Sequence, residues 1–259
     1  MKTESPRGRL VIVPTPLDFG LRDPGPPSDL RDVLPLGVIR QAAAMAHWIA
    51  ENAKSARAFL KRVDQIVPLA QPLQALHIVE LARPVKGAKS QPAPDWAALL
   101  APALVGYDVG LVSEAGLPAV ADPGSELVRA AHDLGIAVLP LPGASALLLA
   151  LAASGLNGQG FAFVGYLPID EPGRSARIRE LEALSRRTAQ SQLAIETPYR
   201  NPALLAALLS TLQPTTRLAV SCGLTLARGW TRSDNVAAWR SRPAHLPADL
   251  PAVFALHAG

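Results

Sequence analysis

The sequence predicts an α/β protein with a parallel sheet, and residues 105–168 provide the main evidence. Short apolar runs at 109–112 and 136–141 alternate in this stretch with turns made of small residues, and a helical pattern follows each turn. Alternation of strand, loop and helix is typical of parallel sheets. Ligands of such sheets bind beyond the carboxyl ends of the strands. The turns at 113–118 and 142–146 therefore either border a ligand site or are tight connectors, and composition alone leaves both interpretations open.

Length and composition limit the class of protein. The 259 residues have room for one large domain or two of ordinary size. Hydrophobic residues make up 49%, which is enough for a substantial core. No apolar run approaches the roughly 20 residues that span a bilayer, the N-terminus lacks the apolar core of a signal peptide, and a single cysteine, Cys222, suits a reducing cytosol. We expect a cytoplasmic protein, and its formal charge of +4 is compatible with a polyanionic partner but decides little.

The N-terminal half contains two further predicted strands and one long predicted helix. Residues 10–13 are apolar, as a central parallel strand should be, and residues 76–81 are strand-like. A stripe of apolar residues predicts a helix over 38–63. Residues 1–8 are expected to form a frayed tail. Two Pro-rich segments, 18–35 and 83–95, are expected to be loops, and the second carries the basic residues Arg83, Lys86 and Lys89.

The rest of the chain continues the alternation. Ser125 is placed to cap a helix that Gly135 closes. Later strands are expected at residues 161–167, 193–196, 217–221 and 251–257, and helices at 174–188, 203–212 and 236–240.

Few side chains in the central turns carry obvious chemistry, with Glu114 and Asp122 as the exceptions. This composition favours a pocket that binds a cofactor by backbone hydrogen bonds and shape. The sequence has no phosphate-binding loop, no G-x-G-x-x-G and no H-E-x-x-H, so nucleotide and metal-hydrolase functions have little support. No Cys/His cluster suggests a metal site.

Four motifs in order resemble one known family. The motifs GRLVIVPTPL, LVSEAGLPAVADPG, GIAVLPLPGASA and FVGYLP resemble the tetrapyrrole methylase superfamily, whose members are S-adenosylmethionine (SAM)-dependent methyltransferases. They are most similar to its ribosomal RNA small-subunit cytidine 2′-O-methyltransferase branch. The resemblance implies two α/β domains, 1–141 and 142–259, with a mainly parallel sheet in the first and a mixed sheet in the second. It also implies SAM in the cleft between the domains and a homodimer.

The resemblance implies site residues as well. Candidates for the cofactor are Pro14, Ser113, Ala115, Gly116, Pro118, Pro142, Gly143, Ala144, Ser145, Ala146, Thr197, Leu224 and Thr225. Candidates for the substrate are Thr15, Lys54, Arg57 and Arg200, although Lys54 and Arg57 also fit a solvated helix face. Since a 2′-hydroxyl is a poor nucleophile, a proton acceptor would help it, and we expect this base among Glu114, His77 and Glu80. For His77 and Glu80, the simpler explanation is that each is an ordinary polar residue at a strand edge.

The chain also departs from the branch. Asn52, Gly223 and Ala252 stand where the branch carries charged residues, and the branch's extra C-terminal helical domain has no counterpart. Three functions therefore remain open: ribose 2′-O-methylation of ribosomal RNA, methylation of a small molecule such as a tetrapyrrole precursor, and SAM binding without catalysis. None of them involves a membrane.

Overall fold

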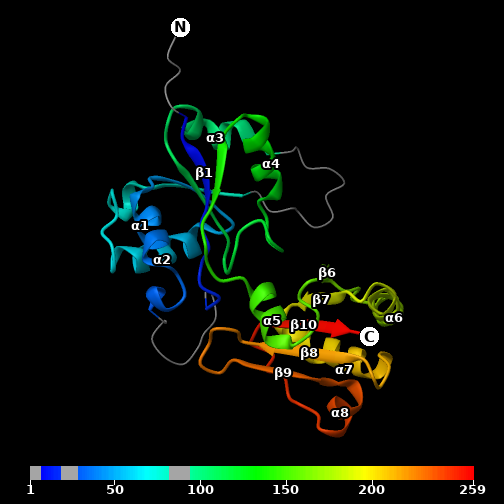
Figure 1. The fold of residues 1–259 in the computed structure, drawn as a ribbon. Coiled ribbons are helices and arrows are strands. Elements are labelled where there is room, and N and C mark those ends of the chain that lie inside the picture. The colour runs from blue at the N-terminus through cyan, green and yellow to red at the C-terminus, as the bar shows by residue number, and fades with distance from the viewer. Residues whose placement is uncertain (1–6, 19–28, 82–93) are drawn as a thin grey trace. The chain divides into compact units, whose positions relative to one another are not determined.

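The computed structural model describes residues 7–18, 29–81 and 94–259, and the chain divides into two compact units (Figure 1). The first unit is Met1–Ala144 and the second is Ser145–Gly259. Each unit is built on its own five-stranded sheet. Most of the expected tail, the middle of the first Pro-rich loop and the basic group Arg83, Lys86 and Lys89 lie outside the described residues.

The sheet of the first unit is entirely parallel, as the sequence predicts. Its strand order is β3-β2-β4-β1-β5. The strands are β1 (Arg9–Ile12), β2 (His47–Ala50), β3 (His77–Glu80), β4 (Val109–Val112) and β5 (Ala137–Pro140). Because all five run in one direction, the turns that follow them meet at a single edge of the sheet.

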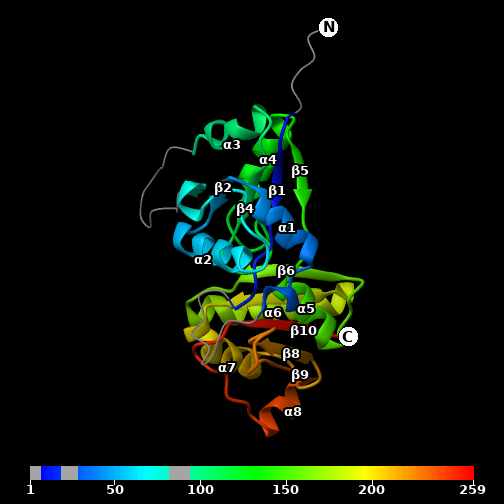
Figure 2. The same ribbon diagram turned by 90° about the vertical axis from the view of Figure 1, so that its left-hand side faces the viewer.

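Helices cover both faces of this sheet, and alternate residues of each strand face opposite layers. Val11 packs with α1 (Leu36–Ala44) and α2 (Ala53–Asp64), the layer that faces the viewer in Figure 2. Leu10 packs on the other face with α3 (Trp96–Leu104) and α4 (Ser125–Asp133). Two short 3₁₀ helices, Leu30–Asp32 and Leu73–Ala75, complete the described part of the unit.

The prediction of a single helix over residues 38–63 is wrong, because the interior strand β2 separates α1 from α2. Trp48, Ile49 and Ala50 are buried between the two helical layers, and β2 pairs with both β3 and β4. A short apolar run fits a buried strand as well as a helix, so periodicity does not separate the two. Asn52 then starts α2, since its side-chain oxygen accepts hydrogen bonds from the backbone N–H of Lys54 (2.9 Å) and of Ser55 (3.3 Å).

Helix α4 differs from the sequence prediction at its N-terminal end and agrees with it at its C-terminal end. Ser125 is the first residue of the helix and not its cap, because Gly124 occupies the capping position with φ 132°. Gly135 ends the helix in the left-handed conformation, with φ 67°, as expected for this residue type.

The sheet of the second unit is mixed, with strand order β6-β7-β10-β8-β9. Only β6 and β7 are parallel neighbours, and the remaining pairs are antiparallel. The strands are β6 (Phe161–Tyr166), β7 (Ser191–Glu196), β8 (Arg217–Cys222), β9 (Trp230–Asn235) and β10 (Ala252–His257). The sequence analysis did not predict β9, an edge strand with mostly polar side chains.

Helices also cover both faces of the second sheet. One face packs against α5 (Ala146–Ser154), and the other against α6 (Glu171–Thr188), α7 (Asn201–Thr211) and α8 (Val236–Ser241). A 3₁₀ helix, Pro198–Arg200, leads into α7. In the described ranges, no helix combines the length and the apolar character needed to cross a membrane.

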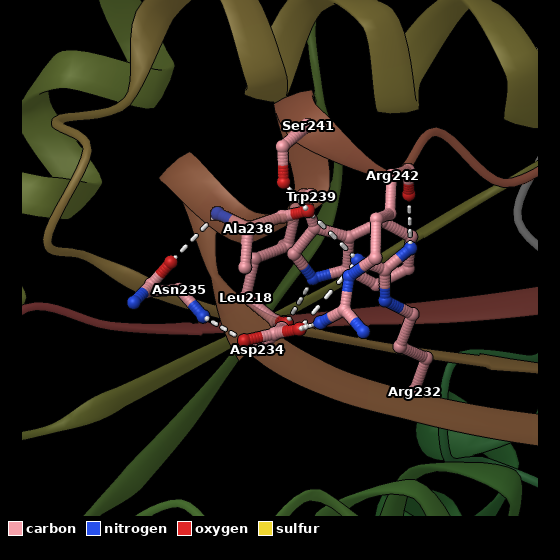
Figure 3. A network of polar contacts seen from close by, with 8 residues as sticks. All are labelled: Leu218, Arg232, Asp234, Asn235, Ala238, Trp239, Ser241 and Arg242. Atoms are coloured by element: carbon pink, nitrogen blue, oxygen red, sulfur yellow. Dashed lines mark hydrogen bonds and ion pairs between the residues drawn. The ribbon is translucent and has the colours of Figure 1, made fainter.

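A polar network fixes α8 against the edge strand β9 (Figure 3). The guanidinium of Arg232 lies 4.0 Å from the centre of the Trp239 ring and donates to the carbonyls of Ala238 and Arg242. Asp234 accepts from the side chain of Arg242 at 3.0 Å. These arginine side chains are therefore engaged in holding the fold together.

Candidate functional site

The turns that follow β1 and β4 are paired with each other at the carboxyl edge of the first sheet. Thr15 and Gly116 form an isolated antiparallel bridge, with N–H to carbonyl distances of 2.9 Å and 3.1 Å. Thr15 is buried, and its hydroxyl lies 3.4 Å from the carbonyl oxygen of Ser113. Gly116 has φ 80°, a conformation that favours glycine.

The turn after β5 lies against the same pair of turns. A Cβ atom on Gly143 would lie 2.3 Å from Cγ of Pro14, so only glycine allows this approach. A Cβ atom on Gly116 would lie 3.7 Å from the carbonyl oxygen of Ala144. The three turns thus form one group of small residues, which we call the cradle: residues 13–17, 113–118 and 142–144.

The cradle contains all of the cofactor candidates of the first unit. They are Pro14, Ser113, Ala115, Gly116, Pro118, Pro142, Gly143 and Ala144. Some, such as Ser113 and Gly116, are buried and give the cradle its shape, whereas Pro142 and Gly143 are exposed. Exposed backbone with little side-chain bulk fits a nucleoside-type cofactor bound by shape and main-chain hydrogen bonds.

Carboxylate side chains surround the turn after β4. Glu51, directly after β2, accepts a hydrogen bond from the backbone N–H of Glu114 at 3.1 Å. Asp122 lies close enough to Ser113, Glu51 and Glu114 for these groups to influence its pKa. From the sequence, Asp122 stands out only as a carboxylate in these turns, and Glu51 was not among the predicted site residues. Glu51 directly follows a buried strand, and this position is the signal that could have identified it. The signal was hidden because the strand was predicted as part of a helix.

The protonation of Asp122 is shifted by its surroundings. Burial raises its pKa to about 6; the hydrogen bond from Ser113 opposes this, and the charges of Glu51 and Glu114 add to it. A carboxyl with this pKa changes charge close to neutral pH. The site therefore contains one group whose charge depends on pH in the physiological range.

The backbone between Ser113 and the start of α4 is held in conformations of low intrinsic stability. Ala119 and Ala121 have φ 63° and 66°, in the left-handed region. Each such residue costs on the order of 1 kcal/mol or more, so the surrounding contacts must hold the loop in place.

The other two candidate bases lie in different places. Glu80 ends β3 at the cradle edge, two strands from β4, and its carboxylate accepts from the N–H of Ala53 at 2.6 Å. His77 begins β3 and so lies at the opposite, amino edge of the sheet. There its ring stacks on that of His47, with centroids 5.1 Å apart. The structure thus brings Glu80 and Glu114 to one edge and places His77 away from both.

The substrate candidates of α2 lie in its first turns. Lys54 and Arg57 are exposed, and Arg57 contacts the carbonyl of Ala53 at 3.4 Å. Exposure of both side chains fits a substrate contact as well as a solvated helix face.

The candidates of the second unit surround one end of its sheet. Glu196 ends β7 and is nearly buried; it accepts from the N–H of Thr197 (2.7 Å) and from the guanidinium of Arg200 (2.7 Å). Ala146, the first residue of α5, and Leu224 pack against the same apolar cluster, and Ser145 is the N-cap of α5. Thr225 follows with φ 66°. The Glu196–Arg200 ion pair is the most strongly connected polar feature at this end.

The first unit has a parallel five-stranded sheet with the cradle at one edge, and the second has a mixed five-stranded sheet. This arrangement defines a class of two-unit α/β proteins. The chain belongs to the tetrapyrrole (corrin/porphyrin) methylase family, whose model matches residues 46–230.

Curated relatives match shorter parts of the chain. "Ribosomal RNA small subunit methyltransferase I" of Pseudomonas aeruginosa is 43% identical over 95 residues, which cover 37% of this chain and 32% of the relative. The protein of the same name from Synechocystis sp. is 40% identical over 134 residues, covering 52% of this chain and 44% of the relative. The chain thus matches less than half of the length of these relatives.

Solved structures agree in fold along the whole chain. The methyltransferase CobJ has a TM-score of 0.53 at 17% identity, covering 96% of this chain and 94% of that one. A putative cobalamin synthesis related protein (CobF) from Corynebacterium diphtheriae has a TM-score of 0.55 at 17% identity, covering 97% and 98%. At this identity the likeness shows the fold alone.

Proposed function

We propose that the protein is a SAM-dependent methyltransferase that acts on ribosomal RNA. The observation that carries the proposal is the cradle, in which the turns after β1, β4 and β5 meet as small residues at one edge of the sheet. Membership of the methylase family supports the reaction, and the names of the curated relatives support the acceptor.

Methyl transfer from SAM requires few reactive side chains. Bound SAM would supply a methyl group on a positively charged sulfur, which an acceptor oxygen can attack directly. The protein has to hold the two reactants in line, and orientation of this kind accounts for a large part of many rate enhancements. The residues of the cradle would hold SAM, with Pro142 and Gly143 offering exposed backbone.

A base is needed to take the proton of the attacking hydroxyl, and we assign this role to Glu114. It lies in the turn after β4, inside the cradle, and its backbone is held by Glu51. Glu80 is on the same edge but is engaged with the N-terminus of α2, and His77 is on the opposite edge. Position therefore favours Glu114 over the other two candidates.

The charges of α6 support a polyanionic acceptor over a small molecule. Arg179, Arg186 and Arg187 are exposed on this helix. Of the two glutamates in the middle of the helix, Glu182 is buried and accepts from Gln213 N–H at 2.8 Å, and Glu180 pairs with Arg177 at 2.7 Å. An exposed basic helix face is suited to phosphate contacts, which supply much of the affinity for nucleic acids.

Two measurements on one set of variants test the proposal. Calorimetry should detect SAM binding to the wild-type protein and to Glu114→Gln. Ribosomal RNA from cells that lack the gene should accept labelled methyl groups from SAM with the wild type, and at least a hundredfold more slowly with Glu114→Gln. Absence of SAM binding would overturn the proposal. Binding with transfer only to small-molecule extracts would replace RNA as the acceptor, and binding without any transfer would leave a SAM-binding protein.

We further propose that the protein is a homodimer. Phe161 on the edge strand β6 and Ile169 just after it are large apolar residues exposed on the second unit, and such surfaces often mark interfaces. Light scattering coupled to size-exclusion chromatography should give twice the chain mass, and a monomer at micromolar concentration would contradict this.

A further inference from the structure

One carboxylate residue anchors the turn after β4 to the neighbouring strand. Glu51 directly follows β2: its backbone N–H donates to the carbonyl of Val112 at 3.1 Å, and its side chain accepts from the N–H of Glu114 at 3.1 Å. The end of β4 and the turn after it are thus both bonded to Glu51.

We propose that Glu51 is a positioning residue for methyl transfer, which fixes the turn that carries Glu114. This proposal rests on the proposed function. It adds to it one residue that acts through the turn and not on the acceptor itself.

The role of Glu51 follows from hydrogen bonding. The N–H of Glu114 is part-buried, and it lies just beyond the last residue of β4. Without the carboxylate it would lose this hydrogen bond, and the loss of a hydrogen bond at a part-buried donor is unfavourable. An amide oxygen in place of the carboxylate can still accept this bond, whereas a methyl group cannot. The contribution of Glu51 should therefore depend on an acceptor atom and less on its charge.

The role of Glu51 is tested with Glu51→Gln and Glu51→Ala. Hydrogen exchange of the peptide that contains residues 113–121 should be close to wild type in Glu51→Gln and at least tenfold faster in Glu51→Ala. The rate of methyl transfer should follow the same order. Equal exchange in the two variants would overturn the positioning role, and this readout does not depend on activity.

Failure of the proposed function would look different from failure of this inference. If the wild type transferred no methyl group, hydrogen exchange would still compare Glu51→Gln with Glu51→Ala. Equal exchange in these two variants would count against the inference, whatever the activity.

Discussion

Trp48 on β2 and Gly110 on β4 are cross-strand partners, and the indole of Trp48 occupies the space beside Gly110. A Cβ atom on Gly110 would lie 2.5 Å from Cε3 and Cζ3 of the ring. Trp48 is almost fully buried, and its Nε1 donates to the carbonyl of Met45 at 3.2 Å. The glycine thus makes room for one of the largest buried side chains of the first unit.

Gly110→Ala should destabilise the protein by about 1–3 kcal/mol, because the added methyl group forces the indole or the strand to move. Chemical denaturation followed by tryptophan fluorescence measures the change. Gly37→Ala is the control, since nothing lies within 4 Å of a Cβ atom there and alanine is favoured in helices such as α1. A wild-type midpoint for Gly110→Ala would show that the indole has space to shift at no cost.

Gly143→Ala should weaken SAM binding by tenfold or more while the protein stays folded. The new methyl group would meet the rigid ring of Pro14 at 2.3 Å, so the turns after β1 and β5 would have to separate. Calorimetry gives the affinity and circular dichroism checks the fold. Gly158→Ala, where a Cβ atom meets nothing within 4 Å, should bind SAM as the wild type does. If both variants bound equally well, the approach of Gly143 to Pro14 would not shape the cofactor site.

Arg232→Lys should destabilise the second unit by about 1–3 kcal/mol even though the charge is kept. A lysine cannot reach both carbonyls of Ala238 and Arg242 while lying over the ring of Trp239 as the planar guanidinium does (Figure 3). Thermal unfolding measures the loss. The same substitution at the exposed Arg179 should be neutral within about 0.5 kcal/mol. Equal effects at the two sites would mean that the network adds nothing to stability.

The stability of the first unit should decrease in mildly acidic solution because of His47. Burial lowers the pKa of its imidazole, and the neighbouring His77 lowers it further. The folded pKa is below the unfolded value of about 6.5, so the unfolded chain binds the proton more readily. The stability contribution is therefore complete above about pH 6.5 and is lost as pH falls through the folded pKa.

His47→Gln removes this proton linkage. Its free energy of unfolding should change less than that of the wild type between pH 7 and pH 5, as measured by denaturant titrations at several pH values. His245→Gln, at an exposed position, should keep the wild-type slope. A wild-type slope in His47→Gln would assign the acid sensitivity to other groups.

Local patterns predicted much of the fold. The run at 109–112 is β4, and the runs at 136–141 and 161–167 contain β5 and β6. In each case a short apolar segment lies between turn-forming residues, which restricts it to a strand. The same reasoning failed at β2, because a buried strand and a buried helix are both continuously apolar. It also did not predict β9, whose edge position allows polar side chains on a true strand.

The sequence by itself determined the parallel α/β character of the first unit and the small-residue turns that form the cradle. Tertiary structure alone decided that the turn after β1 pairs with the turn after β4, that Glu51 holds Glu114, and that His77 lies at the other edge. The reason is that strand order in a sheet differs from chain order. Residues such as Thr15 and Gly116, far apart in sequence, become neighbours only when their strands take places that local propensities do not specify.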